Sequence, residues 1–442
     1  MTAPGPRPWD SAQSQEYVQR WLVTYSEADL AALDDELHTR VEAQEQVMRE
    51  SIVLYAGTNT PNPRLARLLG SPVGSRPHLG PPGDSYNRGM DDGSRIGVLT
   101  AMLMSRLLAA TYVETRVPSG SVANLYAYLA TTRPGDRVLA FSDAAAGHPT
   151  HHAVGAAGLA GLEVHETAFD PTRMDVDLAG LAEQCDRLRP RLLVVAGSMC
   201  LFPYDVAGVR AVADEVGATV LYDAAHMGGL IAGGRFQQPL AEGAHLMTGS
   251  TYKSFGGPPS GFVATNDPDL AERLDRIAFP GLTANHDLAR TAALGMAALD
   301  LLEHGPAYAD ACIATGQALA AALHERDVSV FEVPGRGFTA SQHVAVAAHE
   351  YGGGDTAART LEPAGLLTSS IGLPLPPMPD GQGNALRLGT QEVVRWGMTP
   401  SDMPAVADLV GRVLVDGEPA EHVRPDARAL RTAFDTLHFV RR

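Results

Sequence analysis

The chain has 442 residues, of which 45% are hydrophobic and 19% charged, as is ordinary for a soluble globular protein of two or three domains. Its net charge of −17 repels phosphate backbones, so we expect no nucleic-acid partner. The chain has no apolar run long enough to predict a membrane-spanning helix, so we expect no association with a membrane. The three cysteines have no spacing typical of a zinc site or a disulfide framework, so we expect a cytoplasmic protein that holds no metal.

The N-terminal region is predicted to be a loose arm followed by a helix. Residues 1–15 are rich in proline and have no apolar core after a basic start, so they do not resemble a secretory signal. Residues 26–50 predict a helix that begins with Ser26 and Asp29. Apolar residues then recur at helical spacing, at Leu30, Leu33, Leu37 and Val41.

A long loop and then an alternating pattern follow. Residues 57–93 are full of Gly, Pro, Asn and Ser, and a loop of this length inside a domain is usually functional. From residue 94 to about 280, helical patterns alternate with short apolar runs rich in β-branched residues, which predicts a mostly parallel sheet covered on both faces. The predicted strands are residues 110–115, 138–141, 192–197, 218–223 and 246–250.

The remaining chain predicts a smaller C-terminal domain. Residues 286–325 predict one or two long helices, and shorter strands with a closing helix follow residue 327. We therefore divide the chain into an N-terminal arm and helix (1–50), a large domain (51–300) and a small domain (301–442).

The segment "VPSGSVANLYAYLA" places small, hydroxylated residues at a predicted helix start. The free N–H groups of a helix start, with serine hydroxyls beside them, form a good cradle for a phosphate. Ser119, Gly120 and Ser121 are therefore candidate phosphate ligands. Taken alone, an ordinary capped helix explains these three residues better.

Two charged residues follow predicted strands further along the chain. Asp223 ends an apolar strand, where a carboxylate needs a cationic or N–H partner, and His226 lies close behind it. Lys253 follows the next strand among small residues, and desolvation there would lower its pKa and favour the neutral amine that forms a Schiff base. Alternatively, Asp223 only caps the turn that follows its strand, and Lys253 is an ordinary solvated cation.

Pyridoxal 5′-phosphate (PLP) requires three features that occur here in chain order: a phosphate cradle, an aspartate at a strand end and a lysine among small residues. The cradle would anchor the phosphate, Asp223 would pair with the pyridine nitrogen, and Lys253 would form the Schiff base. His148, in "AGHPTHH", could stack on the ring, although outside this context it would be a surface loop histidine.

These motifs resemble serine hydroxymethyltransferase, in fold type I of the PLP enzymes (the aspartate aminotransferase superfamily). The resemblance runs from about residue 50 to residue 400. It rests on "SGSVAN", "GHPTH", the pattern D-x-A-H-x-x-G-L at 223–230, "TGSTYK" and "RLGT" at 387–390. It implies an α/β fold, with a mostly parallel seven-stranded sheet in a large domain and a smaller α+β C-terminal domain.

The resemblance also assigns roles to individual residues. It assigns cofactor contacts to Ser119, Gly120, Ser121, His148, Ser198, Asp223, His226 and Lys253. Among these it makes Lys253, His148, Asp223 and His226 the catalytic residues. Arg387 would bind the substrate α-carboxylate, because a guanidinium can donate two parallel hydrogen bonds to it, and Tyr86 is a retained substrate-binding tyrosine. The family forms dimers or dimers of dimers with sites at the subunit interface, and its tyrosines of this loop come from the partner subunit.

The sequence departs from the family where substrate and folate would bind. The family's acid/base glutamate falls on Leu79, which cannot move a proton, and this argues against tetrahydrofolate-dependent transfer. A serine that helps to bind the substrate carboxylate falls on Gly57, and the histidine before the lysine is Tyr252. Further departures fall at Pro77, Asn87, Ala284 and Asn285.

The retained residues are sufficient for chemistry at Cα. We therefore predict aldol cleavage or transfer of β-hydroxy-α-amino acids of the threonine or serine type, in which loss of an aldehyde leaves a glycyl carbanion that is protonated or attacks a second aldehyde. Amino acids and aldehydes would be the small-molecule partners. Folate-dependent hydroxymethyl transfer is an alternative, as are transamination, decarboxylation and β-elimination. A further alternative is a non-catalytic scaffold protein. The presence of Lys253, Asp223 and Arg387 argues against it, because a scaffold has no need of all three.

Overall fold

The computed structural model describes residues 7–379 and 381–442, and the chain divides into two compact units after Ser51. In the first unit, α1 spans Ala12–Ser26 and α2 spans Leu30–Glu50. Among the described residues, no helix is long and apolar enough to cross a lipid bilayer.

The helix predicted over residues 26–50 is present as α2 from Leu30 onward, and Asp29 caps it by accepting a hydrogen bond from a main-chain N–H of the first turn. The predicted start at Ser26 is wrong, because Ser26 is the last residue of α1. The loose arm predicted for residues 1–15 is wrong for residues 12–15, which form the first turn of α1. The Ser11 hydroxyl accepts a hydrogen bond from a first-turn amide, and this cap lets the helix begin earlier than the prolines suggested. Residues 1–6 lie outside the described residues.

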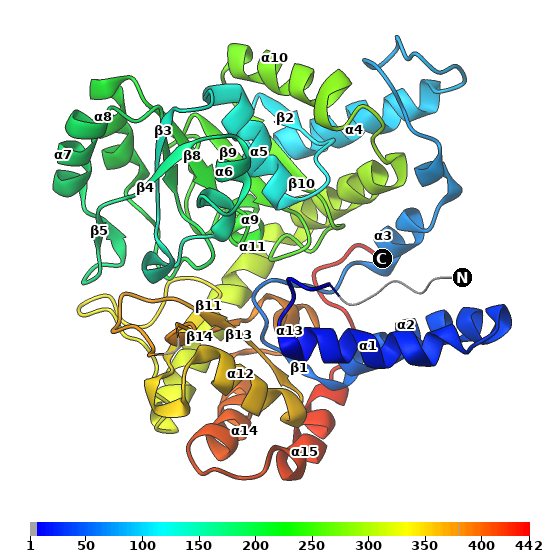
Figure 1. The fold of residues 1–442 in the computed structure, drawn as a ribbon, viewed down its shortest axis with the longest axis vertical. Coiled ribbons are helices and arrows are strands. Elements are labelled where there is room, and N and C mark those ends of the chain that lie inside the picture. The colour runs from blue at the N-terminus through cyan, green and yellow to red at the C-terminus, as the bar shows by residue number, and fades with distance from the viewer. Residues whose placement is uncertain (1–6, 380) are drawn as a thin grey trace. The chain divides into compact units, whose positions relative to one another are not determined.

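The second unit is built around a seven-stranded sheet with the order β2-β10-β9-β8-β7-β3-β4 (Figure 1). Its strands are β2 (Tyr112–Glu114), β3 (Arg137–Ala140), β4 (Glu163–Glu166), β7 (Leu192–Val195), β8 (Thr219–Asp223), β9 (Leu246–Ser250) and β10 (Gly261–Thr265). Strands β4, β3, β7, β8 and β9 are parallel to their neighbours in this series, and only β10 pairs antiparallel, with both β9 and β2. The predicted mostly parallel sheet of seven strands is therefore confirmed.

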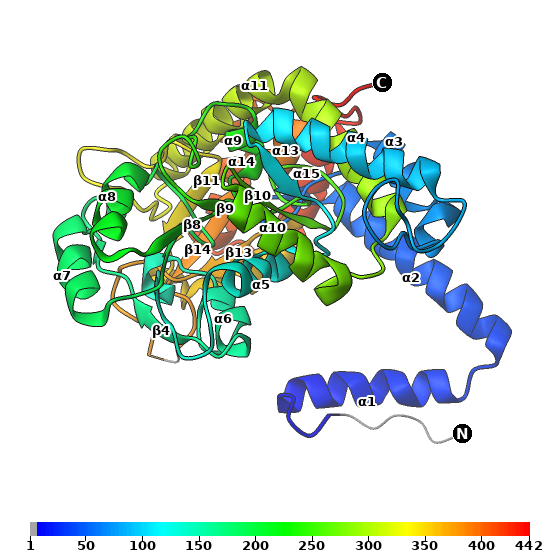
Figure 2. The same ribbon diagram turned by 90° about the horizontal axis from the view of Figure 1, so that it is seen from above.

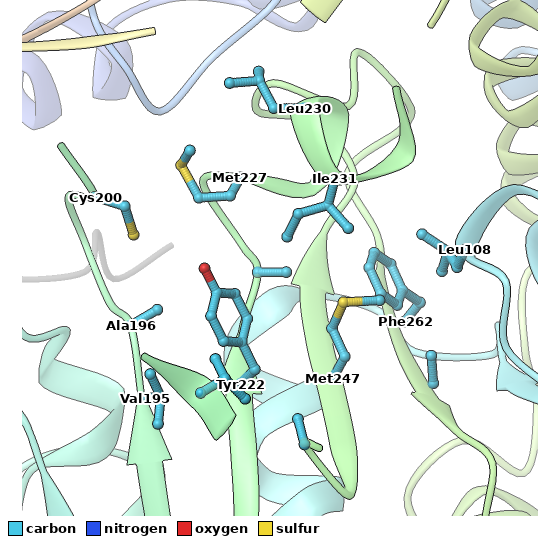
Figure 3. Close-up of a cluster of buried hydrophobic side chains, with 14 of the residues drawn as sticks. Leu108, Val195, Ala196, Cys200, Tyr222, Met227, Leu230, Ile231, Met247 and Phe262 are labelled. Carbon is cyan, nitrogen blue, oxygen red and sulfur yellow. The ribbon is translucent and has the colours of Figure 1, made fainter. Parts of the chain in front are cut away.

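Both faces of this sheet are buried, as expected for strands without polar alternation. Along β7, Leu193 and Val195 belong to one hydrophobic cluster, and Leu192 and Val194 belong to another on the opposite face. Figure 3 shows part of the first cluster, where Val195, Tyr222, Met247 and Phe262 come from four adjacent strands.

Helices cover each face (Figures 1 and 2). The first face is covered by α4 (Asp91–Leu108), α7 (Leu178–Leu188), α8 (Val206–Val216), α9 (Gly228–Ala232) and α11 (Leu288–Glu325), and the second by α5 (Gly120–Thr131), α6 (Ala156–Leu159) and α10 (Pro268–Arg276). Gly217 ends α8 with a φ of 69°, in the left-handed region that glycine adopts without strain. The predicted loop at 57–93 contains only the short α3 (Pro63–Leu69), a 3₁₀ turn (Pro72–Ser75) and the start of α4.

A smaller antiparallel sheet, β11-β14-β13, lies in the C-terminal part of the chain. The strands and helices of this part are β11 (His343–Ala347), β12 (Leu366–Leu367), β13 (Ser369–Ile371), β14 (Ala385–Gly389), α12 (Gly354–Leu361), α13 (Gln391–Arg395), α14 (Met403–Leu414) and α15 (Ala420–Thr432). The short β1 (Ile52–Val53) pairs with β12, and β5 (Phe169–Asp170) pairs with β6 (Asp175–Val176).

The single helix α11 connects the two sheets. Its residue Leu294 packs in the cluster under the large sheet, whereas Leu319 and Leu323 pack in the cluster of the small sheet. The division into large and small domains remains our proposal, and its boundary at residue 300 lies inside this helix.

Candidate active site

The predicted site residues converge where β3, β7, β8 and β9 end. They surround a cavity of about 700 Å³ whose wall includes Lys253, His226, His148, Ser198 and Arg387. Asp223 lies in the same region, only 2% exposed, at the end of β8. The carboxyl ends of parallel strands form one edge of a sheet, which is why segments so far apart in the chain meet here.

Lys253 is buried in this cavity, with 7% of its surface exposed. Its Nζ lies 3.0 Å from Nε2 of His226. Burial lowers the pKa of Lys253 to about 8; the negative charge of Asp223 opposes this shift and the positive charge of Arg387 adds to it. A substantial fraction of the amine is therefore neutral near physiological pH, as a Schiff-base lysine needs.

The turn that carries Lys253 is fixed from several sides. The Ser254 hydroxyl donates to the carbonyl of His226, at 2.6 Å, and the buried Tyr308 hydroxyl donates to the carbonyl of Ser254, at 2.9 Å. The Thr251 hydroxyl donates to the carbonyl of Pro258, at 2.5 Å. The hydroxylated residues around the lysine thus hold the backbone of its turn.

Asp223 is a buried carboxylate with several donors. One oxygen, Oδ2, lies 2.8 Å from His151 Nε2 and accepts from Asn124 Nδ2 at 3.0 Å, and Oδ1 accepts from the Ala225 amide at 2.8 Å. Burial acts to raise the pKa of Asp223, but the hydrogen bond and charge of His151 and the charge of His148 lower it below its ordinary value. The carboxylate therefore stays ionised.

Two partners of Asp223 were missed in the sequence. His151 is 1% exposed, and its Nδ1 lies 2.5 Å from the Tyr128 hydroxyl. Asn124 is held by the Thr248 hydroxyl, which donates to its Oδ1 at 2.7 Å. Both partners lie within motifs that were singled out, since His151 ends "GHPTH" and Asn124 ends "SGSVAN".

The two cavity histidines are neutral. Burial lowers the pKa of His148 to about 4, and its Nδ1 lies 2.8 Å from the Thr150 hydroxyl. Burial, followed by the positive charges of Lys253 and Arg387, lowers the pKa of His226 well below its ordinary value. A neutral ring suits the role predicted for His148, which is to stack on a pyridine, and a neutral His226 can accept a hydrogen bond from Lys253.

The predicted phosphate cradle lies at the start of α5. Ser119 is the N-cap, and its hydroxyl accepts from the Val122 amide at 3.3 Å, so this hydroxyl is used within the helix. Ser121 is exposed. At Gly120, an added Cβ would lie 2.1 Å from Oγ of Ser250, at the end of β9, so the helix start and the strand end approach too closely for any side chain.

Arg387 lies on β14, 7% exposed, and reaches across to the large sheet. Its Nη1 donates to the Ser198 carbonyl at 2.5 Å, and its Nε and Nη2 donate to the Ser369 hydroxyl at 3.3 and 3.2 Å. Burial lowers the pKa of Arg387 to about 10, so the guanidinium remains charged at neutral pH. The Ser198 hydroxyl donates to the carbonyl of Gly147, at 3.1 Å.

The wall of this cavity does not include five of the predicted site residues, namely Ser119, Gly120, Ser121, Asp223 and Tyr86. Asp223 acts on Lys253 through its charge, whereas Tyr86 is 82% exposed. Leu79, in the same loop, is also absent from that wall among the described residues. That the tyrosines of this loop serve the site of a partner subunit stays a prediction from the resemblance.

The residues present fit PLP. The buried amine of Lys253, with its lowered pKa, suits the aldehyde of PLP, and the ionised Asp223 suits the pyridine nitrogen. The neutral His148 suits the pyridine ring, and the helix start packed on Ser250 suits the phosphate. The cationic Arg387 remains for an amino-acid carboxylate.

Comparisons with known proteins agree with this geometry. A family model described as "Serine hydroxymethyltransferase" matches residues 30–410. The chain is 43% identical over 442 residues to an alpha-methylserine aldolase from Ralstonia sp, covering 98% of this chain and 99% of that protein. It is 36% identical over 400 residues to a serine hydroxymethyltransferase from Archaeoglobus fulgidus, covering 90% and 91%. Among solved structures, L-threonine transaldolase from Pseudomonas fluorescens in the internal aldimine state matches with a TM-score of 0.84 at 25% identity, covering 93% and 94%.

Proposed function

The chain belongs to the serine hydroxymethyltransferase family, and from this premise we propose that it is a PLP-dependent aldolase that acts on β-hydroxy-α-amino acids, with an α-methylated serine as its preferred substrate. The observation that carries the substrate is the 43% identity to an alpha-methylserine aldolase over almost the whole of both chains. Cleavage of the Cα–Cβ bond of α-methylserine yields alanine and formaldehyde by atom balance. A serine or threonine donor would undergo cleavage of the same Cα–Cβ bond.

Four parts of the site would hold PLP. Lys253 would provide the covalent attachment, Asp223 would pair with the pyridine nitrogen, His148 would stack on the ring, and the start of α5 at 119–121 would hold the phosphate. When bound, PLP withdraws electrons from the bonds to Cα of the amino acid attached to it. Ser198 and His226 complete the cofactor contacts in this proposal.

The residues of the cavity supply binding and proton transfer. Arg387 holds the α-carboxylate and so fixes which bond at Cα is cleaved. The β-hydroxyl must lose its proton as the aldehyde forms, and the unprotonated fraction of Lys253 and the neutral His226 beside it are the bases that we assign to this step. Lys253 can then return a proton to Cα, which completes the conversion to the product amino acid.

The glutamate of the folate-dependent reaction is replaced by Leu79, so the aldol reaction proceeds here without a folate carrier. Transfer to a second aldehyde, the reaction in the name of the structurally similar transaldolase, would require a second aldehyde to occupy the cavity after the first has left. We also propose a cytoplasmic homodimer or dimer of dimers, since Tyr86 needs a second chain to reach a site and Cys185, Cys200 and Cys312 are free and buried.

The test is to incubate the PLP-loaded protein with α-methylserine, serine and threonine, with and without tetrahydrofolate and with and without an added aldehyde. We expect formaldehyde and alanine from α-methylserine at a rate that tetrahydrofolate does not change. Cleavage of serine that depends strongly on tetrahydrofolate would return the protein to the usual reaction of its family. Transamination to a keto acid as the main reaction would also overturn the proposal.

A further inference from the structure

The wall of the cavity beside Arg387 contains an unusual pair, Tyr55 and Gly57. The phenol of Tyr55 lies over the Cα of Gly57: a Cβ added to Gly57 would lie 2.6 Å from Cζ and 2.7 Å from Oη of Tyr55. The φ of Gly57 is not in the left-handed region, so its backbone does not require glycine. The missing side chain is therefore explained by the space that the Tyr55 phenol occupies.

Hydrogen bonds hold the segment that contains Tyr55 and Gly57 against the end of β14, the strand that carries Arg387. The Leu54 carbonyl accepts from the Gly389 amide at 2.7 Å. The buried Gln391 side chain donates to the carbonyls of Tyr55, at 3.1 Å, and Thr58, at 2.9 Å. The backbone of Tyr55 is thus anchored to the segment that begins just after Arg387, and such preorganisation is typical of groups that bind one ligand together.

The chemistry of the pair suits a carboxylate. The guanidinium carbon of Arg387 lies 6.0 Å from the centre of the Tyr55 ring, and three of its nitrogens already donate to Ser198 and Ser369. A carboxylate has two oxygens that together accept several hydrogen bonds, so a donor beyond the guanidinium is needed to satisfy it. The Tyr55 side chain, 37% exposed, is available to a ligand in this cavity, whereas Gly57 offers no side chain at all.

We propose that the Tyr55 hydroxyl donates a hydrogen bond to the α-carboxylate of the amino-acid substrate beside Arg387, and that residue 57 is glycine so that the phenol can lie there. Tyr55 is then a binding and positioning residue for the amino acid. The inference rests on the proposed function, because that function places the substrate carboxylate at Arg387.

The test is the affinity of the PLP-loaded protein for L-alanine, measured by isothermal titration calorimetry, together with KM and kcat for α-methylserine. Loss of a hydrogen bond to a charged group in Tyr55→Phe is expected to weaken alanine binding about 10-fold and to raise KM by a similar factor, with a smaller change in kcat. Tyr112→Phe, which removes a hydroxyl from a tyrosine that is 41% exposed and lies outside this cavity, is the matched control and should bind alanine like the parent protein. Unchanged alanine affinity in Tyr55→Phe would overturn the proposal.

Substitutions at Gly57 provide an independent measurement. Gly57→Ala should displace the phenol and weaken alanine binding as Tyr55→Phe does. Because both substitutions remove the same contact, the double variant should bind alanine with about the affinity of the single variant that binds it less tightly. In a Tyr55→Ala background, Gly57→Ser should restore part of the affinity by supplying a hydroxyl in the vacated space. Fully additive losses, or no recovery with serine, would contradict the shared contact.

These outcomes separate the inference from the function on which it rests. If α-methylserine is not cleaved but alanine binding still depends on Tyr55, the aldolase proposal fails and the assignment of Tyr55 holds. If α-methylserine is cleaved and Tyr55→Phe binds alanine like the parent, only the assignment of Tyr55 fails.

Discussion

At Lys253, burial and neighbouring charge determine the protonation state of a single amine. Burial dominates and lowers its pKa from an ordinary value of 10.5 to about 8, although Asp223 acts in the opposite direction. The lysine shares the cavity wall with Arg387, whose positive charge disfavours a second cation there. A sequence can place a lysine after a strand, but the size of this shift depends on neighbours from β8 and β14.

This pKa predicts how cofactor attachment depends on pH. Because the neutral amine is the nucleophile, the rate of PLP attachment to the cofactor-free protein should rise with pH and level off above about 8. The measurement is borohydride trapping followed by mass spectrometry of the peptide that contains Lys253. Arg387→Gln removes a charge that lowers this pKa and should move the midpoint to higher pH, and Lys253→Ala should trap no cofactor while its fold is retained. A midpoint near that of a free lysine would contradict the buried, neutral amine.

The same shift contributes to stability with a defined sign. The unfolded chain keeps the Lys253 proton up to pH values near 10.5, whereas the folded chain releases it near 8. Between these values the unfolded state binds more protons, so this group makes the free energy of unfolding rise with pH. The contribution is complete above the unfolded pKa and is lost as pH falls through the folded pKa.

At the scale of elements, the junction between α5 and β9 decides whether the helix start can bind a phosphate. Ser119 caps the helix, and Gly120 lets the Ser250 side chain lie against the first turn. The N–H groups of a helix start have no partner within the helix and carry partial positive charge, which suits an anion. If α5 holds the phosphate as proposed, the close approach of strand and helix at Gly120 would matter more than the serine hydroxyls alone.

Gly120→Ala tests this junction. The added methyl would lie 2.1 Å from Ser250 Oγ, so the helix start must shift. Such overpacking costs about 1–3 kcal/mol, and we expect PLP affinity to fall by about 10-fold or more in a fluorescence titration. Gly70→Ala is the control, because its nearest atom would be at an ordinary 3.8 Å, and it should leave PLP affinity unchanged. Unaltered affinity in Gly120→Ala would show that α5 does not hold the phosphate.

At the scale of the whole molecule, we propose that one chain supplies most of the site and that a partner chain completes it. Lys253, Asp223 and Arg387 meet within one chain, whereas Tyr86 is exposed and lies outside its own cavity. The resemblance to a family with sites at the subunit interface leads us to propose that the exposed Tyr86 serves the cavity of a partner chain.

Mixed dimers test the division between subunits. In a dimer of one Lys253→Ala chain and one Tyr86→Ala chain, the second chain keeps its lysine and receives an intact Tyr86 from the first. Random mixing should therefore restore about a quarter of the parent activity if both single variants are inactive and dimers form in pairs. If Tyr86 served its own chain, every mixed dimer would lack a complete site and mixing would restore nothing. Each variant refolded alone is the control.

The sequence by itself determined the type of fold and the succession of the main strands and helices along the chain. It also identified Ser119, Asp223 and Lys253 as candidate site residues, because these signals are local and each motif is contiguous. The tertiary structure decided what those residues contact. Asp223 meets His151 at a separation of 72 positions, and Arg387 meets the carbonyl of Ser198 at a separation of 189. Burial, pKa shifts and the space over Gly57 arise from such distant contacts. They follow from how the parallel strands are ordered across the sheet and how the small sheet packs on it, which no single stretch of the chain encodes.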